Sequence, residues 1–272
     1  MSSKNTISDC LEKSVKYMNT LIMKRLCFII LSCLCIFENS NGMLGDAMSM
    51  DHQSKKTPTV SEPIKQMVLY EAIENRRIVR DFQNKVVPPE VLKRIIDAGL
   101  KAPTYGHLRN WEFVVLQEKK DKENALQFIR KATPAQLEIL DKTLVSGTPQ
   151  QKMYAIAMPR QYSMLYDASH VILPFFKSNP GVMHPSSVSS LNPISSIWCV
   201  IENIFLAATA EGLACSMRIP VGEEGLNVAK VVGAPEDYLL PCYIGLGYPA
   251  EDRPAVEQIE YTAEQKIHFG KW

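Results

Sequence analysis

The sequence predicts an α+β fold, a layered domain of helices and strands, and three observations support this prediction. Strand and helix patterns follow one another without the strict β-α-β alternation of a doubly wound sheet. The segment 194–211 is apolar nearly all round, which is typical of a helix buried on every side, in the centre of a domain or in a dimer interface. The N-terminal segment differs in composition from the rest of the 272-residue chain, and about 210 residues remain for one domain with a sizeable core.

The composition describes a folded domain with balanced charge. The chain is 46% hydrophobic and 22% charged, with a formal net charge of +1, which argues against a disordered chain and against a non-specific nucleic-acid binder. Cys199, Cys215 and Cys242 lie inside apolar runs, and we expect them to be buried as small hydrophobic residues. The sequence has neither a C-x-x-C pair nor a cysteine and histidine cluster at metal-ligand spacing, so it predicts no metal site.

The N-terminal part divides into three segments. Residues 23–42 begin with Met23-Lys24-Arg25 and continue into the apolar run from Leu26 to Phe37, which has the form of a secretory signal or a membrane anchor. If Met23 is the biological start, residues 1–22 are an upstream extension, and residues 43–60 are typical of a flexible linker. A working signal implies export or membrane tethering, whereas a cytoplasmic protein is expected otherwise. Cleavage, lipidation and retention of the apolar run all stay open.

The main domain, residues 61–272, contains both helical and strand patterns. Apolar residues recur at helical spacing after the N-cap Ser61, and short apolar runs between turn formers predict strands. Pro174 is expected to interrupt one of these strands. In chain order we predict helices from Ser61 into an arginine cluster and at 90–100, 122–131, 134–144, 154–166, 194–211 and 223–232, and strands at 112–116, 168–176, 213–219 and 239–246.

Three other segments are predicted to be irregular. Residues 102–111 carry turn formers and hydrogen-bonding side chains directly before a strand, which is a common position for a ligand site. Residues 177–193 are rich in Asn, Pro, Gly and Ser and form either a lid or edge of an active site or a plain exposed loop. Residues 251–272 end on Trp272, an aromatic residue that we expect to pack against a partner subunit.

The arginine cluster is the strongest local signal in the chain. Arg76, Arg77 and Arg80 place three guanidinium groups within five residues at the end of a predicted helix. On a helix Arg76 and Arg80 would face the same way and repel each other unless an anion lay between them. Guanidinium groups suit phosphate oxygens well, so the cluster is interpreted as an anion site. The alternative is a solvated helix end whose cations complement the helix dipole.

Three segments, in this order, resemble the signatures of the FMN-dependent nitroreductase-like flavoproteins. They are Arg76-Arg77-Ile78-Val79-Arg80-Asp81-Phe82, Ala102-Pro103-Thr104-Tyr105-Gly106-His107-Leu108-Arg109-Asn110-Trp111-Glu112-Phe113 and Gly245-Leu246-Gly247-Tyr248-Pro249. They are similar to R-R-S-x-R-x-F, A-P-S-x-x-N-x-Q-P-W-x-F and G-Y-P. The resemblance implies a layered α+β sandwich with a central, mainly antiparallel sheet and surrounding helices. It also implies an intertwined homodimer with FMN at the subunit interface.

By position, the resemblance assigns roles to individual residues. Arg76 and Arg77 would hold the FMN phosphate, Ile78 would contribute its backbone, and Arg80 would lie beside the pyrimidine edge of the flavin ring. A cation at that edge would stabilise the reduced flavin. The resemblance places another group of residues around the same flavin, with the first three coming from the neighbouring subunit: Pro103, Thr104, Tyr105, His107, Met217, Arg218 and Ile219.

The sequence also departs from the family pattern. Ile78 stands where the family has serine, so it offers no hydroxyl group to the cofactor. His107, Arg109 and Asn110 replace the expected Asn, Gln and Pro, which puts the usual amide contacts in doubt. A basic K-x-R pair follows G-Y-P in most members, whereas this chain offers Arg253 alone, with Lys266 as a substitute.

The implied activity is that of an FMN-dependent oxidoreductase and requires no side-chain nucleophile. Hydride from NADH or NADPH would pass to flavin N5, and a nitroaromatic, quinone or similar conjugated acceptor would then take the electrons in a ping-pong cycle. One alternative is reductive dehalogenation, since deiodinases share the three motifs, and another is a non-catalytic flavin-binding or redox-sensing module. The expected partners are a second copy of the chain and a small-molecule acceptor. We expect no nucleic acid, and membrane contact through the N-terminal segment alone.

Overall fold

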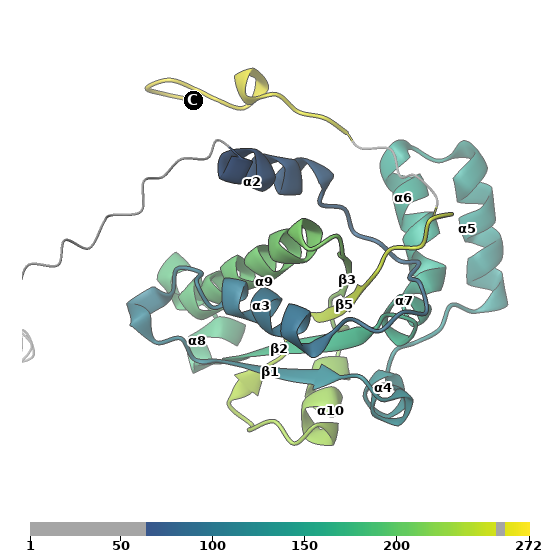
Figure 1. Cartoon of the computed structure of the whole chain (residues 1–272), viewed down its shortest axis with the longest axis horizontal. Helices are drawn as coiled ribbons and strands as arrows, with labels where there is room; N and C mark the ends of the chain where they lie inside the picture. The colour runs from purple at the N-terminus through teal and green to yellow at the C-terminus, as the bar shows by residue number, and fades with distance from the viewer. Residues whose placement is uncertain (1–63, 254–258) are drawn as a thin grey trace, which may run out of the picture. The chain divides into compact units, whose positions relative to one another are not determined.

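A computed structural model describes residues 64–253 and 259–272 of the chain. The predictions for residues 1–22, 23–42 and 43–60, and for the N-cap Ser61, lie outside this range. The described residues form an α+β domain around one mostly antiparallel sheet, which confirms the predicted fold class (Figure 1). The strand order is β1-β2-β5-β3, with β4 also paired to β2, and the bounds are β1 Trp111–Leu116, β2 His170–Lys177, β3 Ala214–Arg218, β4 Tyr238–Leu239 and β5 Tyr243–Gly247.

Helices cover both faces of the sheet, so the domain is a three-layer sandwich. One hydrophobic cluster lies between the sheet and helices α3 and α9, and includes Ile95 and Ile201. A second cluster lies on the opposite face, against α4, α7 and α10, and includes Leu126 and Leu165. Figure 1 shows α3 and α9 on one side of the sheet and α4 and α10 on the other. The helix bounds are α2 Ile64–Asn75, α3 Pro89–Gly99, α4 Lys119–Leu126, α5 Pro134–Ser146, α6 Pro149–Ala157, α7 Ser163–Tyr166, α8 Pro180–Met183, α9 Asn192–Ala210 and α10 Glu224–Val231.

Strand β2 contributes residues to both hydrophobic clusters. It continues through Pro174 without interruption. Ile172 contributes to the first cluster and Leu173 to the second, as the two-residue alternation of a strand requires. Pro174 pairs with Phe113 of β1. On the other edge of β2, pairing with β5 ends at Ile172 and pairing with β4 begins at Phe176, so Pro174 lies in a gap between two ladders. A proline is tolerated there, and the predicted interruption was therefore wrong.

Prolines elsewhere do divide predicted elements. The helix predicted at 154–166 is three pieces, because α6 ends before Pro159 and a 3₁₀ turn, η2 (Met158–Arg160), leads to α7. Likewise the strand predicted at 239–246 is divided into β4 and β5 by Pro241. The segment 177–193 contains α8 and the 3₁₀ helix η3 (Val188–Leu191), so it is less irregular than predicted.

Helix α9 packs its long apolar face on the sheet and on α3, but it is not buried on every side. By length and composition the stretch Val188–Ala210, which joins η3 and α9, could cross a membrane, yet Ile197, Val200 and Ile204 of α9 belong to the core of the domain. The opposite face of α9 exposes a stripe that includes Cys199 and Glu202. The prediction that Cys199 is buried was therefore wrong, whereas Cys215 and Cys242 are buried as predicted.

Candidate functional site

The arginine segment is an extended strand-like chain and not the last turn of a helix. Helix α2 ends at Asn75, and Ile78 forms a parallel bridge with Cys215 of β3, with the amide of Val79 donating to the Cys215 carbonyl at 2.9 Å. The expectation that Arg76 and Arg80 lie one helical turn apart was therefore wrong. Ile78 is partly buried against the first core cluster, which explains an apolar residue where the related motif has serine.

The fold brings the first and third sequence motifs together. Phe82 bridges Pro249, the amide of Gln83 donates to the Tyr248 carbonyl at 2.9 Å, and the amide of Ala250 donates to the Asp81 carbonyl at 2.9 Å. The contact is close, because a Cβ atom on Gly247 would lie 2.9 Å from Cδ1 of Phe82. A larger residue at 247 would push the two segments apart.

A cavity of about 520 Å³ opens beside this junction, a volume within the usual range of small-molecule sites. One wall is the segment 76–81 with Arg253, whose Nη1 donates to the Ala250 carbonyl at 2.9 Å. The opposite wall comes from α6 and η2 and consists of Gln150, Met153, Tyr154, Ile156, Ala157 and Arg160. Four positions of this segment that were predicted to bind the cofactor therefore line one cavity together with Arg253: Arg76, Arg77, Ile78 and Arg80. A single phosphate-bearing ligand would require such a grouping.

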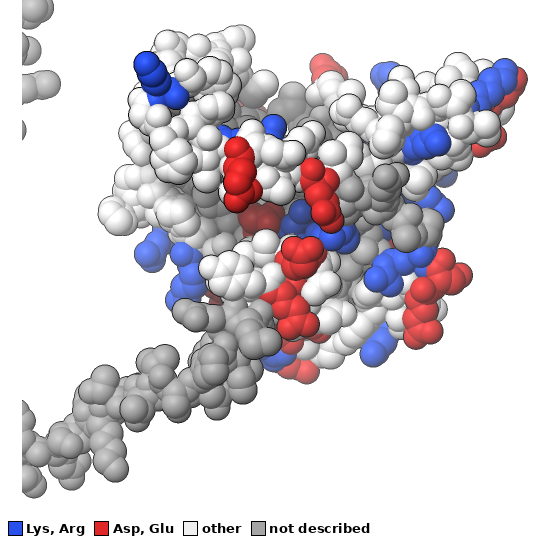
Figure 2. Space-filling model, turned by 90° about the horizontal axis from the view of Figure 1, so that it is seen from above, with Lys and Arg blue, Asp and Glu red and all other residues white. Residues whose placement is uncertain are grey.

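The cavity lining is strongly cationic within a molecule of balanced charge. Five guanidinium groups, of Arg76, Arg77, Arg80, Arg160 and Arg253, and one carboxylate, of Asp81, are among the described lining residues. The face drawn in Figure 2 carries both blue and red side chains, and neither colour covers it. The positive charge is thus concentrated where a ligand can enter, which favours an anionic ligand.

Arg80 carries the clearest sign of a missing partner. Its Nε is buried and has no hydrogen-bond partner among the residues that the structure describes. Burial, followed by repulsion from Arg160, lowers the pKa of Arg80, and the neighbouring Asp81 opposes the shift. The group still carries its charge at neutral pH, because an arginine pKa starts far above that range. An unsatisfied buried donor on a charged group is costly, so this site is suited to a ligand with an acceptor oxygen or nitrogen.

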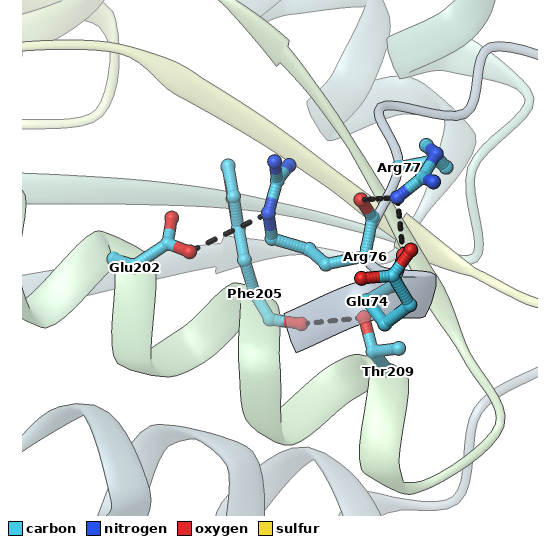
Figure 3. Close-up of polar contacts among 6 residues, drawn as sticks. All are labelled: Glu74, Arg76, Arg77, Glu202, Phe205 and Thr209. Carbon is cyan, nitrogen blue, oxygen red and sulfur yellow. Dashed lines mark hydrogen bonds and ion pairs between the residues drawn. The ribbon is translucent and has the colours of Figure 1, made fainter. Parts of the chain in front are cut away.

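Arg76 and Arg77 point away from each other (Figure 3). Nε of Arg76 lies 3.4 Å from Oε1 of Glu202 on α9. Arg77 turns back to the end of α2, where its Nη1 donates to the carbonyls of Glu74 and Arg76. Arg77 therefore caps the C-terminus of α2, and Arg76 joins that terminus to α9, while both still line the cavity.

The loop that contains the second motif lies outside this cavity in the same chain. The amide of Tyr105 donates to Oγ of Ser196 on α9 at 3.0 Å, and the amide of Arg109 donates to Oγ1 of Thr104 at 3.3 Å. Three of its residues have left-handed backbone conformations, with φ of 59° at Gly106, 54° at His107 and 47° at Arg109. Such conformations in non-glycine residues are uncommon and are concentrated at functional loops. Within the described residues, Pro103, Thr104, Tyr105 and His107 do not contribute to the cavity lining.

The third predicted group lies at the end of β3. Arg218 is buried, with Nη2 2.6 Å from Oε2 of Glu224, Nε 3.1 Å from Oε1 of Glu224, and Nη1 2.9 Å from Oε1 of Gln161. Its guanidinium is thus committed to a structural ion pair, which leaves its backbone for any ligand contact. Met217 packs on the first core cluster, and Ile219 is exposed. The proposed substitute Lys266 lies over the ring of Tyr261, 4.4 Å from its centroid, and is not among the described lining residues.

Sequence reasoning missed the wall formed by α6 and η2. Each helix of the pair α5 and α6 begins with a capping box, at Thr133 with Gln136 and at Thr148 with Gln151. The S/T-x-x-Q spacing predicts these helix starts but gives no indication of what the helices face. The segment 177–193, for which a lid and a plain exposed loop were the two alternatives, contributes no described residue to this cavity. Within residues 64–253 and 259–272, no three His, Cys, Asp or Glu side chains are grouped for metal binding.

The residues present fit a flavin mononucleotide. Clustered guanidinium groups, an orphaned buried Nε and the apolar side chains Met153, Ile156 and Ala157 of the opposite wall match a ligand that combines a phosphate with a polar-edged aromatic ring.

Comparisons with known proteins point to one family. The profile of the Nitroreductase family matches residues 73–248. A protein of Methanothermobacter thermautotrophicus, provisionally named NADH dehydrogenase/NAD(P)H nitroreductase, is 26% identical over 225 residues, which cover 80% of this chain and 95% of that protein. Iodotyrosine deiodinase 1 of Mus musculus is 27% identical over 205 residues, covering 71% of this chain and 68% of that protein. The solved structure of a mutant FMN and NADPH-dependent nitroreductase derived from Sphigopyxis sp. strain HMH shares the fold, with a TM-score of 0.55 and 17% identity over 75% of this chain and 99% of that one.

Proposed function

Because the chain belongs to the nitroreductase family, we propose that this flavin oxidoreductase binds FMN in the cavity between the arginine segment and α6. We propose that it takes hydride from NADH or NADPH and reduces nitroaromatic, quinone or similar conjugated acceptors. The observation that carries the proposal is the group of arginines that the fold gathers there, with the unsatisfied Nε of Arg80 among them. When bound, FMN supplies the hydride and electron-transfer chemistry.

The residues of the chain would bind and orient the cofactor. Arg76 and Arg77 are suited to the phosphate, since their backbone and side chains are fixed at the end of α2. Arg80 is partly buried and stays cationic, so it would stabilise negative charge that develops on a ring beside it. The apolar side chains of α6 would limit water around the ring, which strengthens that electrostatic effect.

We further propose that the active unit is a homodimer. The loop at 103–107 lies outside the cavity of its own chain, and its Tyr105 side chain is 54% exposed, so a second copy would have to supply it to the site. Large apolar side chains that a monomer would leave in water also remain exposed near the C-terminus: Ile259, Tyr261, Ile267, Phe269 and Trp272.

The test is a visible spectrum of the purified full chain during anaerobic titration. Bound flavin should bleach on addition of NADH or NADPH, and the colour should return on addition of a quinone or a nitroaromatic compound. Bleaching by one nucleotide alone would identify the donor. Protein that binds no flavin, or flavin that neither nucleotide bleaches, would contradict the proposal. Flavin at full occupancy that is never turned over by any acceptor would instead favour a flavin-binding or redox-sensing module.

Reductive dehalogenation is a second candidate, favoured by the match to iodotyrosine deiodinase 1 over 205 residues. Both reactions use the same cofactor, and they differ in what leaves the acceptor. Halide released from a halotyrosine by the reduced protein, measured with an ion-selective electrode, would support dehalogenation. Oxidation of the flavin by nitroaromatics without halide release from halotyrosine would exclude it in favour of the first proposal.

A further inference from the structure

Arg160 lies on the wall of the cavity that the sequence motifs do not cover. We propose that Arg160 is a cofactor-binding residue, which together with Arg80 donates to one acceptor group of the flavin nucleotide, on the phosphate or on the polar edge of the ring. The inference rests on the proposed function, because it takes the ligand of the cavity to be FMN. It adds a residue from η2, about 80 positions along the chain from Arg80.

The backbone places Arg160 firmly at this position. Helix α6 begins with the capping box at Thr148 and ends before Pro159, so η2 turns the chain directly after the helix. The side chain is oriented by its own element and by the arginine segment. Nη1 of Arg160 lies 3.4 Å from the Ile156 carbonyl, and its Nε lies 3.2 Å from Oδ1 of Asp81. These contacts leave Nη2 as a donor in a group that lines the cavity.

Arg160 and Arg80 place two positive charges beside a single carboxylate. Asp81 is adjacent to Arg80 in the chain and pairs with Arg160 in space, so it can neutralise one of the two charges. Arg160 is close enough to repel Arg80, whose Nε is buried without a partner among the described residues. Two like charges in a partly buried site are unfavourable unless an anion lies between them. An anionic ligand that accepts from both guanidinium groups would satisfy the free donors and relieve the repulsion.

A plain surface ion pair is the competing interpretation of Asp81 and Arg160. The side chains of both are 35% exposed, and exposed pairs contribute little to stability. That interpretation accounts for the Nε of Arg160 but leaves the Nε of Arg80 buried and unsatisfied. Shared binding of an anion accounts for both groups, and we therefore prefer it.

The test compares flavin affinity in three full-length variants. Arg160→Gln removes the charge, Arg160→Lys keeps it, and Arg130→Gln removes the same charge from an exposed position after α4. Titration by flavin fluorescence gives Kd for FMN and for riboflavin, which lacks the phosphate. We expect Arg160→Gln to raise the Kd for FMN at least about tenfold, Arg160→Lys to raise it less, and Arg130→Gln to leave it unchanged.

The riboflavin titration identifies the acceptor group of the flavin nucleotide that Arg160 binds. Loss of affinity for FMN alone would assign Arg160 to the phosphate, whereas equal loss for FMN and riboflavin would assign it to the polar edge of the ring. Both outcomes support the inference. Equal FMN affinity in the wild type and in Arg160→Gln would overturn it while leaving the proposed function intact. A wild type that binds no flavin would overturn both. The salt dependence of FMN affinity can be measured on the wild type alone, so it does not require any variant to fold. If Arg160 binds the phosphate, FMN affinity should depend on salt more strongly than riboflavin affinity does. Equal salt dependence of the two affinities would exclude the phosphate assignment.

Discussion

Arg76 combines a structural contact with a predicted ligand contact, and a substitution can separate the two. Arg76→Ala removes a guanidinium from the cavity wall and also the partner of Glu202. We expect FMN retention after purification to fall at least about tenfold, because a charge-assisted hydrogen bond to phosphate is worth roughly 1.5–3 kcal/mol. The ratio of flavin to protein absorbance measures it.

Glu202→Gln provides the matched control for Arg76→Ala. It removes the ion pair but keeps the guanidinium, so flavin content should stay at the wild-type level. If Glu202→Gln lost as much flavin as Arg76→Ala, the ion pair and not the phosphate contact would be responsible. Unchanged flavin content in Arg76→Ala would remove Arg76 from the site.

His170 should make the domain sensitive to acid. It is 2% exposed on β2, and burial, followed by repulsion from Lys122, lowers its pKa. The unfolded chain therefore takes up a proton first, near pH 6.5, and stability that is fully present above that pH is lost as the pH falls through the folded pKa. The loss from this group has a limiting slope of about 1.4 kcal/mol per pH unit.

The experiment for His170 is urea unfolding between pH 7 and pH 5. His170→Gln should flatten the decrease in unfolding free energy relative to the wild type. His184→Gln, at an exposed position, should follow the wild-type curve. Parallel curves for all three proteins would show that His170 does not contribute to acid sensitivity.

Residue identities in the first and third motifs could be predicted from the sequence, whereas Arg160 could not. Arg76, Arg80 and Arg253 were named from their motifs, and the fold places all three on one cavity. Arg160 has no motif around it and comes to the cavity through the turn after α6. The helical spacing also predicted wrongly that Arg76 and Arg80 face the same way. It did not reveal that the chain becomes extended at Ile78 to pair with β3.

At the scale of elements, the packing of α3 on α9 depends on a glycine. A Cβ atom on Gly99 would lie 2.8 Å from Cγ1 of Ile204 and 3.3 Å from Cγ1 of Val200. Gly99→Val should therefore separate the two helices, with a loss of about 1–3 kcal/mol in unfolding free energy. Thermal or urea unfolding by circular dichroism measures this loss.

The control for Gly99→Val is Asp97→Val, which introduces the same side chain at an exposed position of α3. It breaks the ion pair with Lys93, for which a few tenths of a kcal/mol is the usual effect. Stability of Gly99→Val equal to that of Asp97→Val would mean that α9 can move to accommodate the new side chain.

Element boundaries were predictable where local chemistry determines them. Apolar spacing and the helix start at Pro134 predicted α3 and α5 nearly at their observed ends. The effect of prolines on helices and strands was harder to predict, because it depends on neighbours that are distant in the sequence. Pro159 ends a helix and Pro241 divides two strands, yet Pro174 lies inside β2 because the ladder beside it has a gap.

At the scale of the whole molecule, the strand order could not be derived from the residues alone. β2 pairs with β1 on one edge and with β5 on the other, and β5 follows β2 by some seventy residues. Mixed strand and helix patterns indicate the α+β class, but pairing over such separations depends on how complementary faces meet in three dimensions. The resemblance to a known family supplied the antiparallel sheet, and the structure confirms it.

The homodimer is the prediction that belongs to the whole molecule. Every residue from 259 to 272 is exposed, and Trp272, stacked on His268 with ring centroids 4.6 Å apart, remains 101% exposed. Phe269 is 92% exposed in the same segment. Exposed aromatic residues at this density are costly in water and are typical of an interface, so we expect this segment to pack on a second copy of the chain.

A double variant tests this interface. Phe269→Ser with Trp272→Ser should shift the full chain from dimer to monomer at micromolar concentration in sedimentation velocity, since buried aromatic residues dominate interface energies. Lys271→Ser, in the same segment, should leave the dimer intact. The double variant should also lose flavin, because the loop at 103–107 would no longer reach the cavity of its partner. A wild-type monomer that binds FMN stoichiometrically would refute the homodimer. A double variant that stays dimeric would show that the interface lies on another surface. The exposed stripe of α9 with Cys199 and Glu202 is the next candidate for that surface.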